Sequence, residues 1–249
     1  MKYTEIFAHR GASQYAPENT LEAFDLAMRQ GADGIELDVQ LTREGKAVVI
    51  HDEEISRVST GEGYVREYTL KELRQFSFHN HMGKYEGVKI PTLEEVLSLV
   101  KRGNMKVNIE LKTGIYWYPH IEEKVLEAVR DAKMQERVIY SSFNHYSIQR
   151  ICELDAHAET AYLFSDVILD VEKYALKNKV SGLHPALYHV EMDGFLESYL
   201  KSGLAVRVWT VNEKEQMEKL FRANVDALIT NRPDVAVSIR KQRMGQEIC

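Results

Sequence analysis

Residues 35–39 read Ile-Glu-Leu-Asp-Val, and this alternation of apolar and acidic residues decides how we interpret the rest of the chain. A period of two is typical of a β-strand, because successive side chains point to opposite faces of the sheet. Glu36 and Asp38 are therefore expected on one face. Buried carboxylates need a compensating cation, so we expect a divalent metal ion, which prefers oxygen ligands. A solvent-facing side of an edge strand is the alternative interpretation.

Strand-like and helical segments alternate along the chain on both sides of this stretch. The predicted strands lie at residues 6–9, 35–39, 47–50, 106–112, 138–142, 160–164, 180–184, 205–211 and 227–230. The predicted helices lie at residues 17–30, from 91 onward, and at 121–132, 147–154, 171–178, 194–202, 214–222 and 233–240. Repeated strand-then-helix units of this length predict a (β/α)8 TIM barrel, with a doubly wound open sheet as the alternative. The pattern leaves open whether 35–39 and 47–50 share one β-unit.

Residues 52–90 interrupt the regular alternation with four glycines and irregular spacing. One short helix is predicted there, because Thr69 and Glu72 have the spacing of a capping box. A connection of this length usually has a function or folds as a small subdomain. We therefore expect one barrel domain over residues 1–249, with an insertion at about 52–90 that caps the mouth of the barrel. The polar tail at 241–249 is expected to be loosely ordered.

Composition limits the class of protein and its partners. The chain has 249 residues, of which 44% are hydrophobic and 28% charged, with a net charge of -6. This balance gives no reason to expect nucleic acid or an anionic membrane as a partner. Cys152 and Cys249 form no redox or metal-binding motif, so two reduced thiols are expected. The absence of a signal-peptide or membrane-spanning run predicts a cytoplasmic protein without stable membrane insertion, either a monomer or a homodimer.

Ionisable residues gather where the predicted strands end, which is where TIM barrels carry their active sites. These residues are His9, Arg10, Glu36, Asp38, His51, Glu110 and Lys112. Three carboxylates suffice for one Mg²⁺ or Ca²⁺, and two histidines can serve as acid and base because their ordinary pKa is about 6.5. Arg10 and Lys112 supply positive charge for a phosphate. Together these side chains indicate metal-assisted phosphoryl chemistry.

Each of these residues also has an ordinary structural interpretation. A lone histidine at a strand end is more often structural than catalytic, and Glu110 with Lys112 could be a surface ion pair worth under about 1 kcal/mol. Trp209 alone would more often belong to the core. The convergence of charged residues at strand ends favours a functional site, although His184 receives no role.

An ordered series of motifs covers nearly the whole chain and resembles the glycerophosphodiester phosphodiesterase family. The motifs are Phe-Ala-His-Arg-Gly at 7–11, Pro-Glu-Asn-Thr at 17–20, Glu-Leu-Asp-Val at 36–39, His-Asp at 51–52, Ile-Pro-Thr-Leu-Glu-Glu at 90–95, Glu-Leu-Lys at 110–112, Ser-Phe at 142–143, Trp-Thr-Val-Asn at 209–212 and Thr-Asn-Arg-Pro at 230–233. Any single motif is weak, but the complete set in this order is specific.

The resemblance implies a TIM barrel that hydrolyses glycerophosphodiesters, as small-molecule substrates, to glycerol 3-phosphate and an alcohol. It implies His9 and His51 as catalytic residues and one divalent cation, Mg²⁺ or Ca²⁺, held by Glu36, Asp38 and Glu110. The side chains expected to contact substrate or phosphate are Arg10, Lys112, Trp209 and Phe143.

We expect His9 to act as base and His51 as acid in a first step, in which the 2-hydroxyl of the glycerol attacks phosphorus and forms a cyclic phosphate. Water then opens this ring with the two roles reversed. Lysophospholipase D or a related phospholipid phosphodiesterase is one alternative. A non-catalytic barrel that binds glycerophosphodiesters is an alternative of another class.

Overall fold

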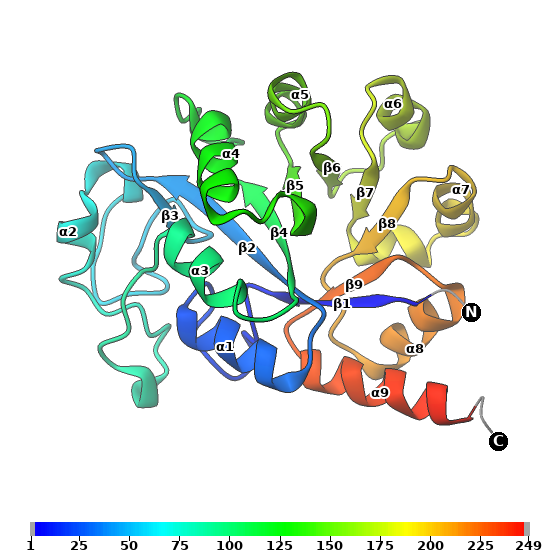
Figure 1. Ribbon diagram of the computed structural model, residues 1–249. Coiled ribbons are helices and arrows are strands. Elements are labelled where there is room, and N and C mark those ends of the chain that lie inside the picture. The colour runs from blue at the N-terminus through cyan, green and yellow to red at the C-terminus, as the bar shows by residue number, and fades with distance from the viewer. Residues whose placement is uncertain (1–2, 247–249) are drawn as a thin grey trace.

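A closed parallel barrel surrounded by helices forms the body of the protein (Figure 1). The computed structural model describes residues 3–246. Within these residues, eight parallel strands pair around the barrel: β1 Glu5–His9, β2 Gly34–Leu41, β4 Lys106–Leu111, β5 Val138–Ser142, β6 Glu159–Phe164, β7 Gly182–Pro185, β8 Ala205–Val208 and β9 Ala227–Thr230. Strand β1 pairs with both β2 and β9 and so closes the sheet. The TIM barrel is confirmed, and the open sheet is excluded.

Eight α-helices of the described residues cover the barrel from outside (Figure 1): α1 Leu21–Gln30, α3 Leu93–Val100, α4 Ile121–Ala132, α5 His145–Leu154, α6 Val171–Lys177, α7 Phe195–Lys201, α8 Lys214–Ala223 and α9 Pro233–Gln246. A 3-10 helix, η3 Gln135–Arg137, precedes β5, and another, η4 Leu187–Glu191, precedes α7. No helix in the described part of the chain is both long and apolar enough to cross a bilayer.

Several element boundaries differ from the prediction, among them the ends of α9 and β8. Helix α9 continues to Gln246, so residues 241–246 of the expected loose tail are helical, because Lys241, Arg243 and Met244 are good helix formers. Residues 247–249 lie outside the described residues. Strand β8 ends at Val208, three residues before its predicted end, because the chain turns into the loop that carries the next motif.

Strand β3 (Ala47–Val49) pairs antiparallel with the end of β2, where Val39 lies opposite Val49. It follows a tight turn in which Gly45 has a positive φ of 77°, a backbone conformation that glycine adopts at little cost. Strands β2 and β3 therefore share one β-unit, and β3 lies outside the closed barrel.

The alternation in β2 sorts its side chains as the sequence predicts. Ile35, Leu37 and Val39 are fully buried in the layer between the barrel and helices α1, α3 and α4, while Glu36 and Asp38 face the opposite way. Gly34 begins the strand because a Cβ there would lie 2.5 Å from the ring of Phe7. The missing side chain of Gly34 leaves the space that the ring of Phe7 occupies.

The segment between β3 and α3 has a hydrophobic core of its own. It contains the short elements η1 Val65–Glu67, α2 Leu70–Leu73 and η2 Gly83–Tyr85, and the predicted capping box of Thr69 with Glu72 is confirmed. Its buried apolar side chains are Ile50, Ile55, Val58, Val65, Leu73, Phe78 and Ile90, and they pack with Val48 of β3. The hydroxyl of Tyr85 donates to the carbonyl of Tyr15 in the β1–α1 loop. The insertion therefore packs at the end of the barrel where the strands terminate (Figure 1).

Candidate active site

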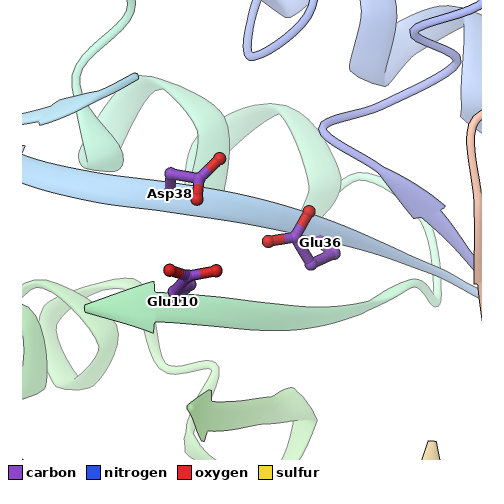
Figure 2. Close-up of side chains that lie close together, drawn as sticks. All are labelled: Glu36, Asp38 and Glu110. Atoms are coloured by element: carbon purple, nitrogen blue, oxygen red, sulfur yellow. The ribbon is translucent and has the colours of Figure 1, made fainter. Parts of the chain in front are cut away.

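Three buried carboxylates meet between strands β2 and β4. Figure 2 shows Glu36 and Asp38 on β2 and Glu110 on β4 with their side chains turned toward one another. Candidate ligand atoms of the three residues all lie within 4.8 Å of one another. The parallel register explains the cluster, because it places Asp38 directly beside Glu110 on the same face of the sheet. The predicted edge-strand alternative is excluded, since β2 pairs on both sides and all three carboxylates are buried.

The electrostatics of this cluster would favour a bound cation. Burial raises the pKa of Glu36 well above its ordinary value, and the charges of Asp38 and Glu110 raise it further. Burial and Asp38 likewise raise the pKa of Glu110. Burial also opposes ionisation of Asp38, but Arg10 and other neighbours lower its pKa to about 2. Asp38 Oδ1 is buried with no hydrogen-bond partner, so one carboxylate oxygen is left for a ligand such as a metal ion.

Arg10 and Lys112 border the carboxylates from two sides. The backbone N–H of Arg10 donates to Glu36 Oε2 at 3.0 Å, and its Nε lies 3.4 Å from Asp38 Oδ2. Lys112 Nζ donates to Glu110 Oε1 at 3.0 Å. The two cations offset part of the negative charge of the cluster and provide fixed positive charge for a phosphate.

The β1–α1 loop needs an unusual backbone to place Arg10. Arg10 has a φ of 56° and Gly11 a φ of 84°, both in the left-handed region. A Cβ on Gly11 would lie 2.7 Å from the backbone of Ala23 in α1. Glycine therefore allows the chain to pass close to α1 while presenting the backbone N–H of Arg10 to Glu36.

His9 ends β1, and its imidazole is held by a neutral amide. His9 Nδ1 lies 2.7 Å from Asn231 Oδ1, an oxygen that also accepts from the hydroxyl of Ser13 at 3.1 Å. An amide oxygen only accepts, so Nδ1 carries the proton and the lone pair of the neutral ring is on Nε2. Burial, and then the charge of Arg10, lower the pKa of His9 to about 4. The ring is therefore neutral at pH 7.

His51 is held by a carboxylate. Its Nδ1 lies 2.5 Å from Asp52 Oδ1, and the other oxygen of Asp52 accepts from Arg57 Nε at 2.5 Å. Arg57 also contacts Glu18, which binds Arg10 Nη1 at 2.8 Å. Asp38 interacts electrostatically with both His9 and His51, so both imidazoles lie within electrostatic reach of the acidic cluster.

Phe143 and Trp209 form an aromatic pair at the same end of the barrel. Their ring centroids are 5.5 Å apart in an edge-to-face arrangement. Phe143 follows β5 and Trp209 follows β8, strands that are separated in the sheet by β6 and β7, so the rings meet across the mouth. Trp209 Nε1 donates to the backbone carbonyl of His184 at 2.8 Å.

His184 lies fully buried on β7 beside Arg207, with 3.4 Å between His184 Nε2 and Arg207 Nη1. Burial and this positive charge lower the pKa of His184 well below its ordinary value. It is therefore a neutral histidine of the barrel interior. Strand β7 pairs with β6 and β8 and is not a neighbour of β2 or β4, which carry the carboxylates.

Several residues of the network received no role from the sequence. They are Glu18, Asn19, Asp52, Arg57 and Asn231. Asn19 Nδ2 donates to Asp38 Oδ2 at 2.8 Å. Four of the five fall within the motifs quoted above, and this membership was the only sign in the sequence that they matter. The spacing of these residues along the chain does not predict which side chains they contact. Arg57 lies outside every motif.

Comparisons with known proteins identify the family. The model of the glycerophosphoryl diester phosphodiesterase family matches residues 9–235. A glycerophosphodiester phosphodiesterase of Caldanaerobacter subterraneus subsp. tengcongensis is 42% identical over 237 residues, which is 95% of this chain and 97% of the relative. The structure of an Oleispira antarctica phosphodiesterase in complex with the product sn-glycerol-3-phosphate has a TM-score of 0.85 and 27% identity, covering 95% of this chain and 96% of that one. The chain therefore belongs to the glycerophosphoryl diester phosphodiesterase family.

Proposed function

We propose that this chain, a phosphodiesterase by family, hydrolyses glycerophosphodiesters to glycerol 3-phosphate and an alcohol with the help of one divalent cation, Mg²⁺ or Ca²⁺. The observation that carries the proposal is the buried cluster of Glu36, Asp38 and Glu110 with Arg10 and Lys112 in contact. The Oleispira antarctica phosphodiesterase, whose fold this chain shares, binds sn-glycerol-3-phosphate as its product.

The three carboxylates would hold the cation. Their chemistry fits it, because hard divalent ions prefer oxygen ligands and Asp38 Oδ1 is buried without a hydrogen-bond partner. When bound, the ion would supply Lewis-acid stabilisation of charge on the phosphoryl oxygens. A phosphodiester is a poor electrophile because its own charge repels nucleophiles, and Arg10 and Lys112 would offset that repulsion from the protein side.

His9 is suited to the role of base in the first step. Its neutral partner Asn231 fixes the ring with Nε2 as the acceptor, and its low pKa keeps that nitrogen unprotonated at pH 7. His9 would take the proton from the 2-hydroxyl of the glycerol, which then attacks phosphorus from within the substrate at high effective molarity. The product of this step is a cyclic phosphate.

His51 is suited to the role of acid. Asp52 Oδ1 lies 2.5 Å from Nδ1, so Nε2 is the nitrogen that would donate a proton to the departing alcohol. In the second step His51 would take a proton from water, which opens the cyclic phosphate, and His9 would return a proton to the glycerol oxygen. The different partners, an amide for one ring and a carboxylate for the other, support this assignment of roles.

A second candidate substrate is a lysophospholipid, as for a lysophospholipase D. The segments that follow β4, β5, β6 and β7, including the first turn of α5 and the helix η4, lie at the active-site end of the barrel and expose large apolar side chains. These are Ile115, Trp117, Phe143, Tyr146, Val167, Leu169, Tyr188 and Met192. Large exposed apolar side chains gathered on one face are typical of surfaces that contact apolar ligands, and here they could receive an acyl chain.

The experiment is a metal-controlled hydrolysis assay. Glycerophosphocholine, glycerophosphoethanolamine, glycerophosphoglycerol, glycerophosphoinositol and lysophosphatidylcholine are incubated with Mg²⁺, Ca²⁺ or EDTA, and the released glycerol 3-phosphate or lysophosphatidic acid is measured. Turnover of the first four that EDTA abolishes supports the proposal. Turnover of the lysolipid that Trp117→Ala and Leu169→Ser selectively reduce supports the second candidate. Binding without turnover of any substrate would instead favour the non-catalytic barrel.

A further inference from the structure

Arg57 of the insertion makes contacts that join two parts of the candidate active site. Its Nη1 and Nη2 bind Glu18 as a fork, at 2.9 Å to Oε2 and 2.7 Å to Oε1. Its Nε binds Asp52 Oδ2, while the other oxygen of Asp52 holds His51. Both oxygens of Asp52 are thus occupied, one by the histidine and one by the insertion.

The insertion holds Arg57 in place through its own core. Ile55 is fully buried and Val58 is 5% exposed, and a short turn between them is closed by hydrogen bonds to the carbonyl of Ile55 from the backbone N–H groups of Val58 and Ser59. Arg57 projects from this turn toward the β1–α1 loop. Its position is therefore set by packing within the insertion rather than by the barrel.

We infer that Arg57 is a positioning residue that fixes Asp52, and through it His51, for protonation of the leaving alcohol. The inference rests on the function proposed above. Asp52 without Arg57 could rotate about its side-chain bonds and exchange its hydrogen bond to His51 for water. The ring would then no longer keep Nδ1–H as its only tautomer, and Nε2 would lose its fixed direction.

An ordinary surface ion pair is the competing interpretation. Arg57 is 45% exposed, and exposed pairs contribute little to stability. The chain provides a matched pair for comparison, because Arg43, which is 55% exposed, binds Glu72 of the same insertion at 3.0 Å. Arg43 and Glu72 contact neither histidine. If Arg57 acted only through general ion pairing, the loss of either arginine would have the same effect.

The test compares Arg57→Ala, Arg57→Gln and Arg57→Lys with the control Arg43→Ala on two substrates. Glycerophosphocholine has an alcohol leaving group that needs a proton, whereas the glycerol 3-phosphate ester of 4-nitrophenol has a leaving group that does not. We expect Arg57→Ala to lower kcat for glycerophosphocholine by about 10–100-fold with little change in KM, and to leave the nitrophenyl ester almost unaffected. Lysine keeps the charge but lacks the planar fork, so Arg57→Lys should restore only part of the rate. Added guanidinium ion should restore part of the rate of Arg57→Ala.

A readout independent of activity is the ¹⁵N NMR spectrum of His51. At a pH where the ring is neutral, the full-length protein should show a single Nδ1–H tautomer, and Arg57→Ala a mixture, with Arg43→Ala unchanged. Equal loss of rate on both substrates, or an unchanged His51 tautomer in Arg57→Ala, would overturn the inference. If the unmodified protein hydrolysed neither substrate, the proposed function would fail, while the tautomer measurement would still decide whether Arg57 positions His51. Should Arg57→Ala fold poorly, Arg57→Gln and Arg57→Lys provide the same comparison.

Discussion

Glu36 and Asp38 are two residues apart on one strand, yet their carboxyl groups are in opposite electrostatic states. Arg10, Lys112 and Asn19 all act on Asp38 and hold its pKa low against burial. Burial and the two neighbouring carboxylates raise the pKa of Glu36, and Arg10 offsets only part of this rise through its charge and its backbone N–H. One member of the cluster is therefore held in its ionised form, while burial opposes the ionisation of another.

This difference predicts a stability gain on replacing Glu36 in the metal-free chain. Because the pKa of Glu36 in the folded state lies above its ordinary value of 4.5, the ionised group destabilises the fold at neutral pH, and the protonated group does not. Metal-free Glu36→Gln should therefore unfold at higher urea than the unmodified chain at pH 7. The gain should shrink as the pH falls from 7 toward the ordinary pKa of 4.5 and be lost below it, where the carboxyl is protonated in both states.

Urea titrations in EDTA between pH 7 and pH 4.5 measure this effect. Glu94→Gln is the control, because Glu94 pairs with Lys46 on the surface and its pKa is lowered rather than raised. A gain for Glu36→Gln that did not change with pH would contradict the explanation.

The histidine pair gives a second prediction at this scale. His9→Ala and His51→Ala should each lower kcat by at least about 100-fold, and the double variant should be little worse than either single one. Burial, and then Arg10, lower the pKa of His9 to about 4, so the acidic limb of kcat/KM should lie below the ordinary histidine value of 6.5. The profile as a whole should be bell-shaped, and its two apparent pKa values should belong to the histidine pair rather than to either residue alone.

Initial rates between pH 4 and pH 10, with metal held constant, check this prediction. His157→Ala, a change at an exposed histidine outside the site, should keep the unmodified rate. Near-normal rates in both site variants would return His9 and His51 to structural roles.

At the scale of elements, the insertion is a folded unit attached to the barrel by short contacts. Its core is separate from the two large clusters between the strands and the outer helices. The link to the β1–α1 loop runs through Tyr85, Arg57 and Glu18. A local change inside the insertion can therefore affect the active site without unfolding the barrel.

Leu73→Ala tests this separation. Leu73 is fully buried in the insertion core, and truncating a buried leucine costs about 2–5 kcal/mol. We expect the loss to appear as faster hydrogen exchange in residues 52–90, with the barrel strands still protected, and as reduced activity on glycerophosphocholine. Leu97→Ala, in the barrel core on α3, should instead lower protection throughout the protein. Equal exchange profiles for the two variants would show that the insertion is not a separate unit.

On the scale of the whole molecule, barrel closure brings the two ends of the sequence into one site. His9 and Asn231 are 222 positions apart and share a hydrogen bond, because β1 pairs with β9 and closes the ring. The carboxylate cluster likewise depends on β2 and β4, which are neighbours only because the insertion is accommodated outside the barrel.

A bound cation should consequently stabilise the entire fold. Divalent metal at a hundredfold excess over its Kd should add about 2.7 kcal/mol to the free energy of unfolding and raise Tm, and EDTA should reverse the change. The triple variant Glu36→Gln, Asp38→Asn, Glu110→Gln should show no metal-dependent rise in Tm. Calorimetric scans with Mg²⁺, Ca²⁺ and EDTA measure this, and a metal-dependent rise in the triple variant would place the cation elsewhere.

The sequence by itself determined the parts of this protein that depend on neighbouring residues. The period of two in β2 and β4 assigned Glu36, Asp38 and Glu110 to one face, since side-chain direction in a strand is a local property. The repeated strand-then-helix order predicted the barrel, and the spacing of Thr69 and Glu72 predicted a helix start. These predictions hold because each depends only on residues close together in the chain.

Only the tertiary structure decided which distant side chains meet. The amide of Asn231 holds His9, Arg57 joins Asp52 to Glu18, and the rings of Phe143 and Trp209 meet across the mouth. No periodicity encodes these contacts, because they arise from loops whose paths are fixed by packing of the whole barrel. The pairing of β3 with β2 outside the ring has the same origin. The different hydrogen-bond partners of His9 and His51 therefore follow from the fold, since both are histidines near strand ends whose partners the fold supplies.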